Sequence, residues 1–237
     1  MSYQINDLML ILGEPIETDV GKLHHLTVSD YIKFSTEIQL LSMSKLEIIY
    51  QFQMDNKQGT HDKLIKVLDK SSLWDIVQIL PDFTEAYEII FAKVFTDEDV
   101  MEKISEENFY DIREQIMRMN VIKEEPINPN PEIQKAWDRS KRVKAEMAEK
   151  VTVEDMITSV SVFADRPYDM IRGMTVYQFM MDYQRIAAAF DYQTAILFST
   201  VSTDKIKIES WSRHIDLFQQ DKHELDEATA NRIKQAF

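Results

Sequence analysis

The chain has 237 residues, no cysteine and a net charge of −14, because 41 Asp and Glu residues outnumber 27 Lys and Arg residues. The missing cysteines exclude disulfides, thiolate nucleophiles and Cys-type zinc sites, and the acidic balance argues against nucleic-acid binding through phosphate neutralisation. No apolar run reaches the roughly 18 residues that a membrane span needs, and the first residues lack the basic start of a signal peptide. We therefore expect a cytoplasmic protein that neither crosses a membrane nor is secreted.

The N-terminal segment predicts a small β-hairpin. Two apolar runs, Leu8–Leu12 and Lys22–Leu26, flank a stretch that contains the turn residues Gly13, Pro15 and Gly21. Short apolar runs around turn residues are typical of paired strands. The chain's glycines are also isolated from one another, so the glycine-rich loops that hold nucleotide phosphates cannot be formed, and we expect no cofactor.

Helical periodicity follows the hairpin. Thr27 or Ser29 can cap a helix whose apolar residues recur every three or four positions up to Leu41. Capping residues then predict further helix starts at Ser44, Ser72, Asp82, Asp97 and Ser105. The later helices of this half are expected over residues 61–69, 72–80, 82–95, 97–104 and 106–120.

A proline-rich segment predicts a boundary at residues 124–131. Pro126, Pro129 and Pro131 cannot continue a helix. The charge changes at the same place: residues 1–125 hold 12 Lys and Arg against 24 Asp and Glu, whereas residues 126–150 hold 6 against 4. We therefore expect an acidic helical domain over 1–123 and a C-terminal helical domain over 132–237.

The C-terminal part also predicts helices. Pro131 is well placed as a first helical residue, and Thr152 and Thr175 can cap two later helices. The helix expected over 176–200 has the strongest apolar periodicity, and a last pair is expected over 208–219 and 223–236. The fold class is therefore mainly α, a multi-helix bundle with a small N-terminal β-hairpin.

Candidate metal and catalytic residues are few. His24 and His25 are adjacent, so on a strand they point to opposite faces and cannot share one ion. His214 and His223, with Asp216, Asp221 and Glu224 nearby, leave a carboxylate–imidazole cluster conceivable, but their spacing matches no HExxH-like geometry. Asp97-Glu98-Asp99 lacks the glycine of a calcium loop and fits a helix start. We expect no enzyme and no metal site.

One helix after the boundary is rich in basic residues: Lys135, Arg139, Lys141, Arg142 and Lys144 surround Trp137. Basic residues around an aromatic ring can form a nucleic-acid patch. Interspersed carboxylates nearly neutralise this one, so a solvated face, or a face that docks on the acidic half of the chain, is the preferred interpretation. The thirteen methionines fit ordinary core filling, and the alternative is an adaptable apolar surface.

Several segments near the two ends resemble phage tail assembly chaperones. The segment Ile171–Tyr183 is similar to their "T-x-Y-Q" helix entry, and Ser210–Ile215 to their terminal tryptophan helix. Leu10–Ile16 and Leu26–Tyr31 are similar to the hairpin and helix start of the same genes. The resemblance implies a non-enzymatic role in the host cytoplasm, namely binding of the tape measure protein while the tail tube assembles.

The resemblance places client binding on the C-terminal helix region. The expected client-binding residues are Tyr177, Phe179, Met180, Met181, Tyr183 and Trp211. Trp211 is expected in the core, against the apolar stripe of the 176–200 helix, and the alternative is an exposed anchor for the partner. We expect a protein partner, with self-association open, and no nucleic acid or membrane. The other readings are an acidic adaptor that mimics a polyanion and, less favoured, a carboxylate/His metal enzyme.

Overall fold

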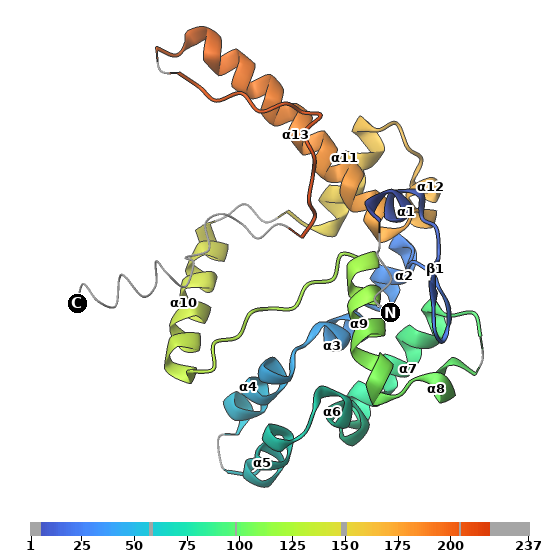
Figure 1. Cartoon of the computed structure of the whole chain (residues 1–237). Coiled ribbons are helices and arrows are strands. Elements are labelled where there is room, and N and C mark those ends of the chain that lie inside the picture. Colours follow the sequence, from blue (N-terminus) through green and yellow to red (C-terminus); the bar gives the residue numbers. More distant parts are fainter. Residues whose placement is uncertain (1–5, 57–58, 98, 148–150, 204, 219–237) are drawn as a thin grey trace.

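The computed structural model describes residues 6–56, 59–97, 99–147, 151–203 and 205–218. Within these ranges the chain is mainly α with one two-stranded antiparallel hairpin, as the sequence predicts (Figure 1). The first half contains α1 (Asp7–Leu12), β1 (Ile16–Thr18), β2 (Gly21–Leu23), α2 (Val28–Lys33), α3 (Ser35–Ser42), α4 (Lys45–Asp55), α5 (Asp62–Lys70), α6 (Leu73–Ile79), α7 (Pro81–Val94), α8 (Val100–Lys103) and α9 (Glu106–Met119). The second half contains α10 (Pro131–Met147), α11 (Val153–Phe163), α12 (Tyr168–Gly173) and α13 (Val176–Val201).

Side-chain caps define most of the predicted helix starts. Ser72, Ser105, Thr152 and Thr175 each form a capping box with the residue three positions later, and the Ser44 hydroxyl accepts the Glu47 amide. These hydrogen bonds satisfy amides that the first helical turn cannot pair. These five predicted caps are confirmed. The starts predicted at Asp82 and Asp97 are wrong, because α7 begins at Pro81 after Leu80 and α8 begins at Val100 after Asp99.

The apolar run Leu8–Leu12 is a helix and not a strand, so this prediction is wrong. The Asn6 carboxamide oxygen accepts the Leu8 amide at 3.0 Å and starts α1. Gly13, at φ 71°, ends it in the left-handed conformation and donates its amide to carbonyls of the last turn. The hairpin lies just after this helix and pairs Ile16 with Leu23.

Two further predictions need correction. The helix expected from Thr27 to Leu41 is two helices, α2 and α3, which are separated at Phe34. Residues 208–218 are turns and irregular chain, so the helix predicted there is absent from the described part of 208–219. The helix predicted over 223–236 lies outside the described residues.

Two clusters of buried side chains hold the fold together. The main core lies among the hairpin, α3, α4, α6, α7 and α9, and its largest fully buried side chains include Tyr87, Phe91 and Phe109. The second cluster joins α11, α12 and α13 with Val28 of α2. The first turn of α13 contributes to both clusters, through Tyr177 in the main core and Phe179 in the second.

The segment 124–130 is irregular, with Pro131 beginning α10, and it is anchored near both ends. The Arg113 guanidinium of α9 donates to the Glu124 carboxylate at 2.5 Å, and the Asn128 amide donates to the Gln134 side chain at 2.7 Å. The division into domains at this segment stays a prediction. The structure adds that Tyr177 and Leu217, both from the C-terminal side, pack in the main core.

Candidate protein-interaction site

The six residues expected to bind a client do not form one surface. Tyr177 and Phe179 are only 4% exposed and connect α13 to the two clusters of buried side chains, which gives them a packing role. Met180, Met181 and Tyr183 are half-buried beside them. Their assignment to client binding stays a prediction, with less side-chain surface available than the sequence suggests.

Trp211 lies on the surface, so its expected burial in the core is wrong. Its side chain is 50% exposed. The Arg185 guanidinium donates to the carbonyl oxygens of Trp211 and Arg213, at 2.5 and 2.8 Å, and so ties this irregular segment to α13. Because these hydrogen bonds hold the segment through its backbone, the Trp211 ring does not have to be buried to keep the segment in place.

A large apolar surface covers the outer half of α13 and the end of α11. The rings of Phe163 and Phe190 meet edge to face, 4.8 Å apart between centroids. Phe190, Leu197 and Val201 share one stripe of α13, since they are seven and four residues apart. We call the exposed side chains Val162, Phe163, Phe190, Leu197, Phe198 and Val201 the distal surface.

The distal surface is unusual because the helix beneath it has almost no charge. Residues 192–203 contain no charged side chain, although 29% of the whole chain is charged. Leu197 is 69% exposed and Val201 is 80% exposed, and Figure 1 shows this end of α13 projecting from the rest of the molecule. A helix that is apolar on several sides is normally buried, and exposed apolar patches of this kind mark interaction sites.

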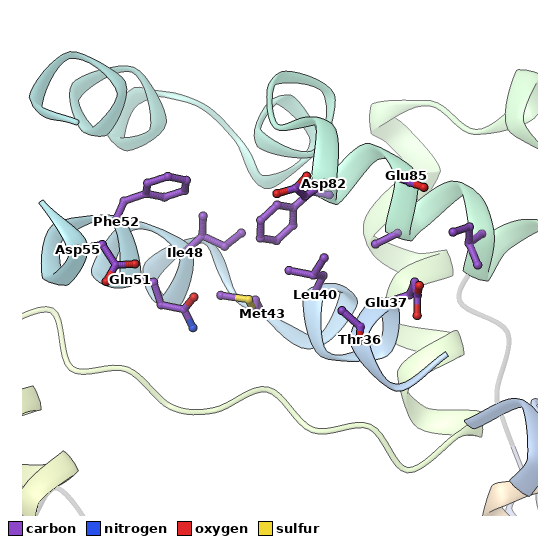
Figure 2. A pocket seen from close by; sticks show the side chains of 13 residues that line it. Thr36, Glu37, Leu40, Met43, Ile48, Gln51, Phe52, Asp55, Asp82 and Glu85 are labelled. Carbon is purple, nitrogen blue, oxygen red and sulfur yellow. The ribbon is translucent and has the colours of Figure 1, made fainter. Parts of the chain in front are cut away.

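A groove between α3, α4 and α7 is the second candidate (Figure 2). Its volume is about 520 Å³, and its floor is apolar: Leu40, Met43, Ile48, Phe52, Phe83, Ala86 and Ile89. Four carboxylates, from Glu37, Asp55, Asp82 and Glu85, also line it, and no basic residue does. We call it the acidic groove. Its shape suits an apolar side chain or helix that carries positive charge beside it.

The candidate metal residues do not converge. No group of three or more His, Asp and Glu side chains within the described ranges could hold a metal ion. His24 and His25 were expected on a strand, but they follow β2 and lie outside it. The His25 ring instead bridges two carbonyl oxygens, Met119 at 3.3 Å from Nδ1 and Glu14 at 3.2 Å from Nε2, and burial lowers its pKa. The predicted partner of His214, His223, lies outside the described residues.

The segments that carry the chaperone resemblance meet in space. The Thr27 and Thr175 segments form an antiparallel bridge, and the Gln178 side chain donates to the Ile11 carbonyl at 2.8 Å. A Cβ on Gly13 would lie 3.2 Å from the Thr175 methyl group, and the φ of 71° also favours glycine at this close approach of α1 to α13. Three of these motifs therefore build a junction between α1, α2 and α13, whereas the fourth, Ser210–Ile215, carries the exposed Trp211.

Sequence reasoning missed the distal surface and the acidic groove. The signal for the first was present, since an uncharged stretch of twelve positions, 192–203, is conspicuous in so charged a chain. The groove had no local signal, because its walls come from three helices that are separate in sequence.

The fold and these surfaces define a mainly helical protein with exposed apolar sites. Its residues 4–129 match the YomV N-terminal domain and residues 143–216 match the YomV second domain. The SPbeta prophage-derived uncharacterized protein YomV of Bacillus subtilis (strain 168) is 34% identical over 227 residues, which cover 95% of each chain. The chain therefore belongs to the YomV family of phage-derived proteins. No solved structure matches it significantly. No helix in the described part of the chain is both long and apolar enough to cross a membrane.

Proposed function

We propose that this protein is a non-enzymatic phage tail assembly chaperone that acts in the host cytoplasm and binds the tape measure protein while the tail tube assembles. The observation that carries the proposal is the distal surface, an exposed apolar face on a projecting helix. Membership of a phage-derived family is consistent with a phage protein as the partner.

The physical demands of this role fit the chain. A long coiled-coil-prone client exposes apolar stripes until it is packed, and a chaperone must cover them with apolar contacts that can be released. The distal surface offers Phe163, Phe190 and Leu197 for such contacts. A net charge of −14 keeps a protein with such a surface soluble and disfavours its nonspecific aggregation.

An acidic adaptor is the second candidate, and the carboxylates of the acidic groove favour it. Such an adaptor would bind a basic partner through charge. Its affinity would fall steeply with salt, because exposed charges are screened beyond about 10 Å at 0.1 M salt. The chaperone's affinity would change little over the same range, since apolar contacts dominate.

The direct test measures binding of the full chain to the tape measure protein encoded by the same phage. We expect Leu197→Glu to weaken binding by more than about tenfold without lowering the melting temperature, because Leu197 is exposed and the new charge must be desolvated in the complex. Val67→Glu on α5 is the matched control, since Val67 is also an exposed apolar helix residue. Absence of binding by the unmodified chain, or equal binding by the Leu197→Glu variant, would overturn the proposal.

A further inference from the structure

Helix α10 contacts the rest of the chain through polar side chains on one of its sides. Gln134 is only 1% exposed, and its side-chain amide donates to Asp138 at 2.8 Å. Asp138 in turn accepts the hydroxyl of Tyr50 on α4 at 2.7 Å, and Lys141 pairs with Glu125 at 3.0 Å. Because Gln134, Asp138 and Lys141 are four and three residues apart, they lie on one side of the helix.

The opposite side of α10 is exposed and carries a narrow apolar stripe, with Glu132 and Ser140 among its apolar residues. Ala136, Val143 and Met147 are seven and four residues apart, so they form one stripe, and all three are exposed. Met147 is 85% exposed. An amphipathic helix in a soluble protein normally turns its apolar side toward the core. In α10, residues 139–147 are exposed on every side of the helix, so the stripe of Ala136, Val143 and Met147 is left for another molecule to cover.

Basic side chains flank this stripe. Arg139 and Lys144 lie on its two edges, next to Val143, and Arg142 lies beyond Arg139. None of the three forms an ion pair with any described residue. Glu146 lies between Arg139 and Arg142 around the helix, so the border of the apolar stripe carries three positive charges and one negative charge.

The acidic groove is complementary to this side of α10 in polarity and charge. Its apolar floor is bordered by Glu37, Asp55, Asp82 and Glu85, none of which forms an ion pair with a described residue. A helix that binds in a groove uses apolar side chains on one face as anchors, and flanking charges set its orientation. The chain's own α10 cannot present its apolar stripe to this groove while its polar side holds Tyr50 and Glu125.

We propose that a second copy of this chain supplies the missing partner, with α10 of each copy bound in the acidic groove of the other. A two-fold symmetric pair would make this contact twice, which is the usual form of a homodimer. The inference is independent of the tape measure proposal, because it uses a different helix and a different surface. It also predicts that added salt weakens the dimer, since its charge pairs lie at the border of the contact.

Charge reversal tests the pairing directly. The mass of the full chain is measured by sedimentation velocity at several concentrations up to about 100 µM, and we expect a dimer. Arg139→Glu combined with Arg142→Glu should weaken the dimer by more than about tenfold, and so should Asp82→Lys combined with Glu85→Lys, because each places like charges together. Arg172→Glu combined with Lys205→Glu makes the same change of net charge as the variant of Arg139 and Arg142, but elsewhere, and should leave the dimer unchanged.

Mixing the two reversed variants gives the decisive result. Each groove then meets a helix of opposite charge, so a dimer containing one copy of each variant should form with nearly the original affinity. The melting temperature of each variant shows whether it is folded. A monomer at every concentration, a dimer that neither reversal weakens, or a mixture that stays monomeric would each overturn the proposal.

Discussion

Thr27 and Thr175 cap two different helices and form an antiparallel bridge with each other. The Val28 amide donates to the Met174 carbonyl at 2.9 Å, and the Val176 amide donates to the Leu26 carbonyl at 3.1 Å. Helices α2 and α13 therefore begin side by side. This bridge joins the chain's N-terminal region to its longest helix and decides which turn of α13 enters the core.

We expect loss of the Thr175 cap to lower the free energy of unfolding by about 1 kcal/mol. The Thr175 hydroxyl oxygen accepts the Gln178 amide at 3.1 Å, and alanine cannot replace this hydrogen bond. Thr175→Ser keeps the hydroxyl and serves as the control. Urea unfolding of the two variants measures the difference, and equal losses in both would show that the methyl contact with α1 matters and the cap does not.

Trp211→Ala should cost less stability than Thr175→Ala. The ring of Trp211 is half exposed, and exposed substitutions typically change stability by about 0.5 kcal/mol or less. The melting temperatures of the two variants give the order. A much larger loss for Trp211→Ala would mean that the ring packs against α13 in solution, as the sequence suggested.

Arg113→Met should lower the free energy of unfolding by about 3 kcal/mol, because it removes a buried cation that several groups share. Arg113 donates to the carbonyl oxygens of Leu41 and Met43 and to the Tyr87 hydroxyl. Burial raises the pKa of Tyr87 to about 12, so the neutral hydroxyl accepts this bond throughout the physiological range.

The control for Arg113 is Glu124→Gln. Glu124 is nearly half exposed, so its loss should cost only about 1 kcal/mol. Chemical unfolding measures both variants. A loss for Glu124→Gln as large as that for Arg113→Met would mean that the ion pair, and not the carbonyl and hydroxyl contacts, supplies the stability.

Stability should fall as the pH drops from about 7 to 5, because burial lowers the pKa of His25 below its usual value of about 6.5. The unfolded chain then binds the proton more readily than the folded chain. The contribution of neutral His25 to stability is complete above the pKa that it has in the unfolded chain. This contribution is lost as the pH falls toward the lower pKa of the folded chain. His25→Gln should flatten this decline in thermal melts, while His24→Gln should keep it. An unchanged slope in His25→Gln would assign the decline to other groups.

Limited proteolysis should cut first within residues 124–131, since this irregular segment contains the predicted boundary. The two fragments should stay together on a sizing column, because Tyr177 and Leu217 from the C-terminal side pack in the main core. Earlier cleavage within 29–54 or 175–200 would place the boundary elsewhere. Fragments that separate at once would show that the shared packing is weak.

The sequence by itself predicted the helical class, the start of most helices and the irregular segment at 124–131. These features depend on residues that are neighbours in the chain. A capping box needs only Thr152 and Asp155, or Thr175 and Gln178, and a proline stops a preceding helix from continuing through it.

Only the tertiary structure decided which apolar residues are buried and which are left for partners. Tyr177 and Leu197 lie on the same helix and look alike as apolar positions, yet the first enters the main core and the second faces solvent. The difference comes from contacts with α1 and α2, which are distant in sequence and pack against the first turns of α13. The outward stripe of α10 has the same cause, since Tyr50 and Glu125 hold the polar side of that helix and so determine which way its apolar side faces.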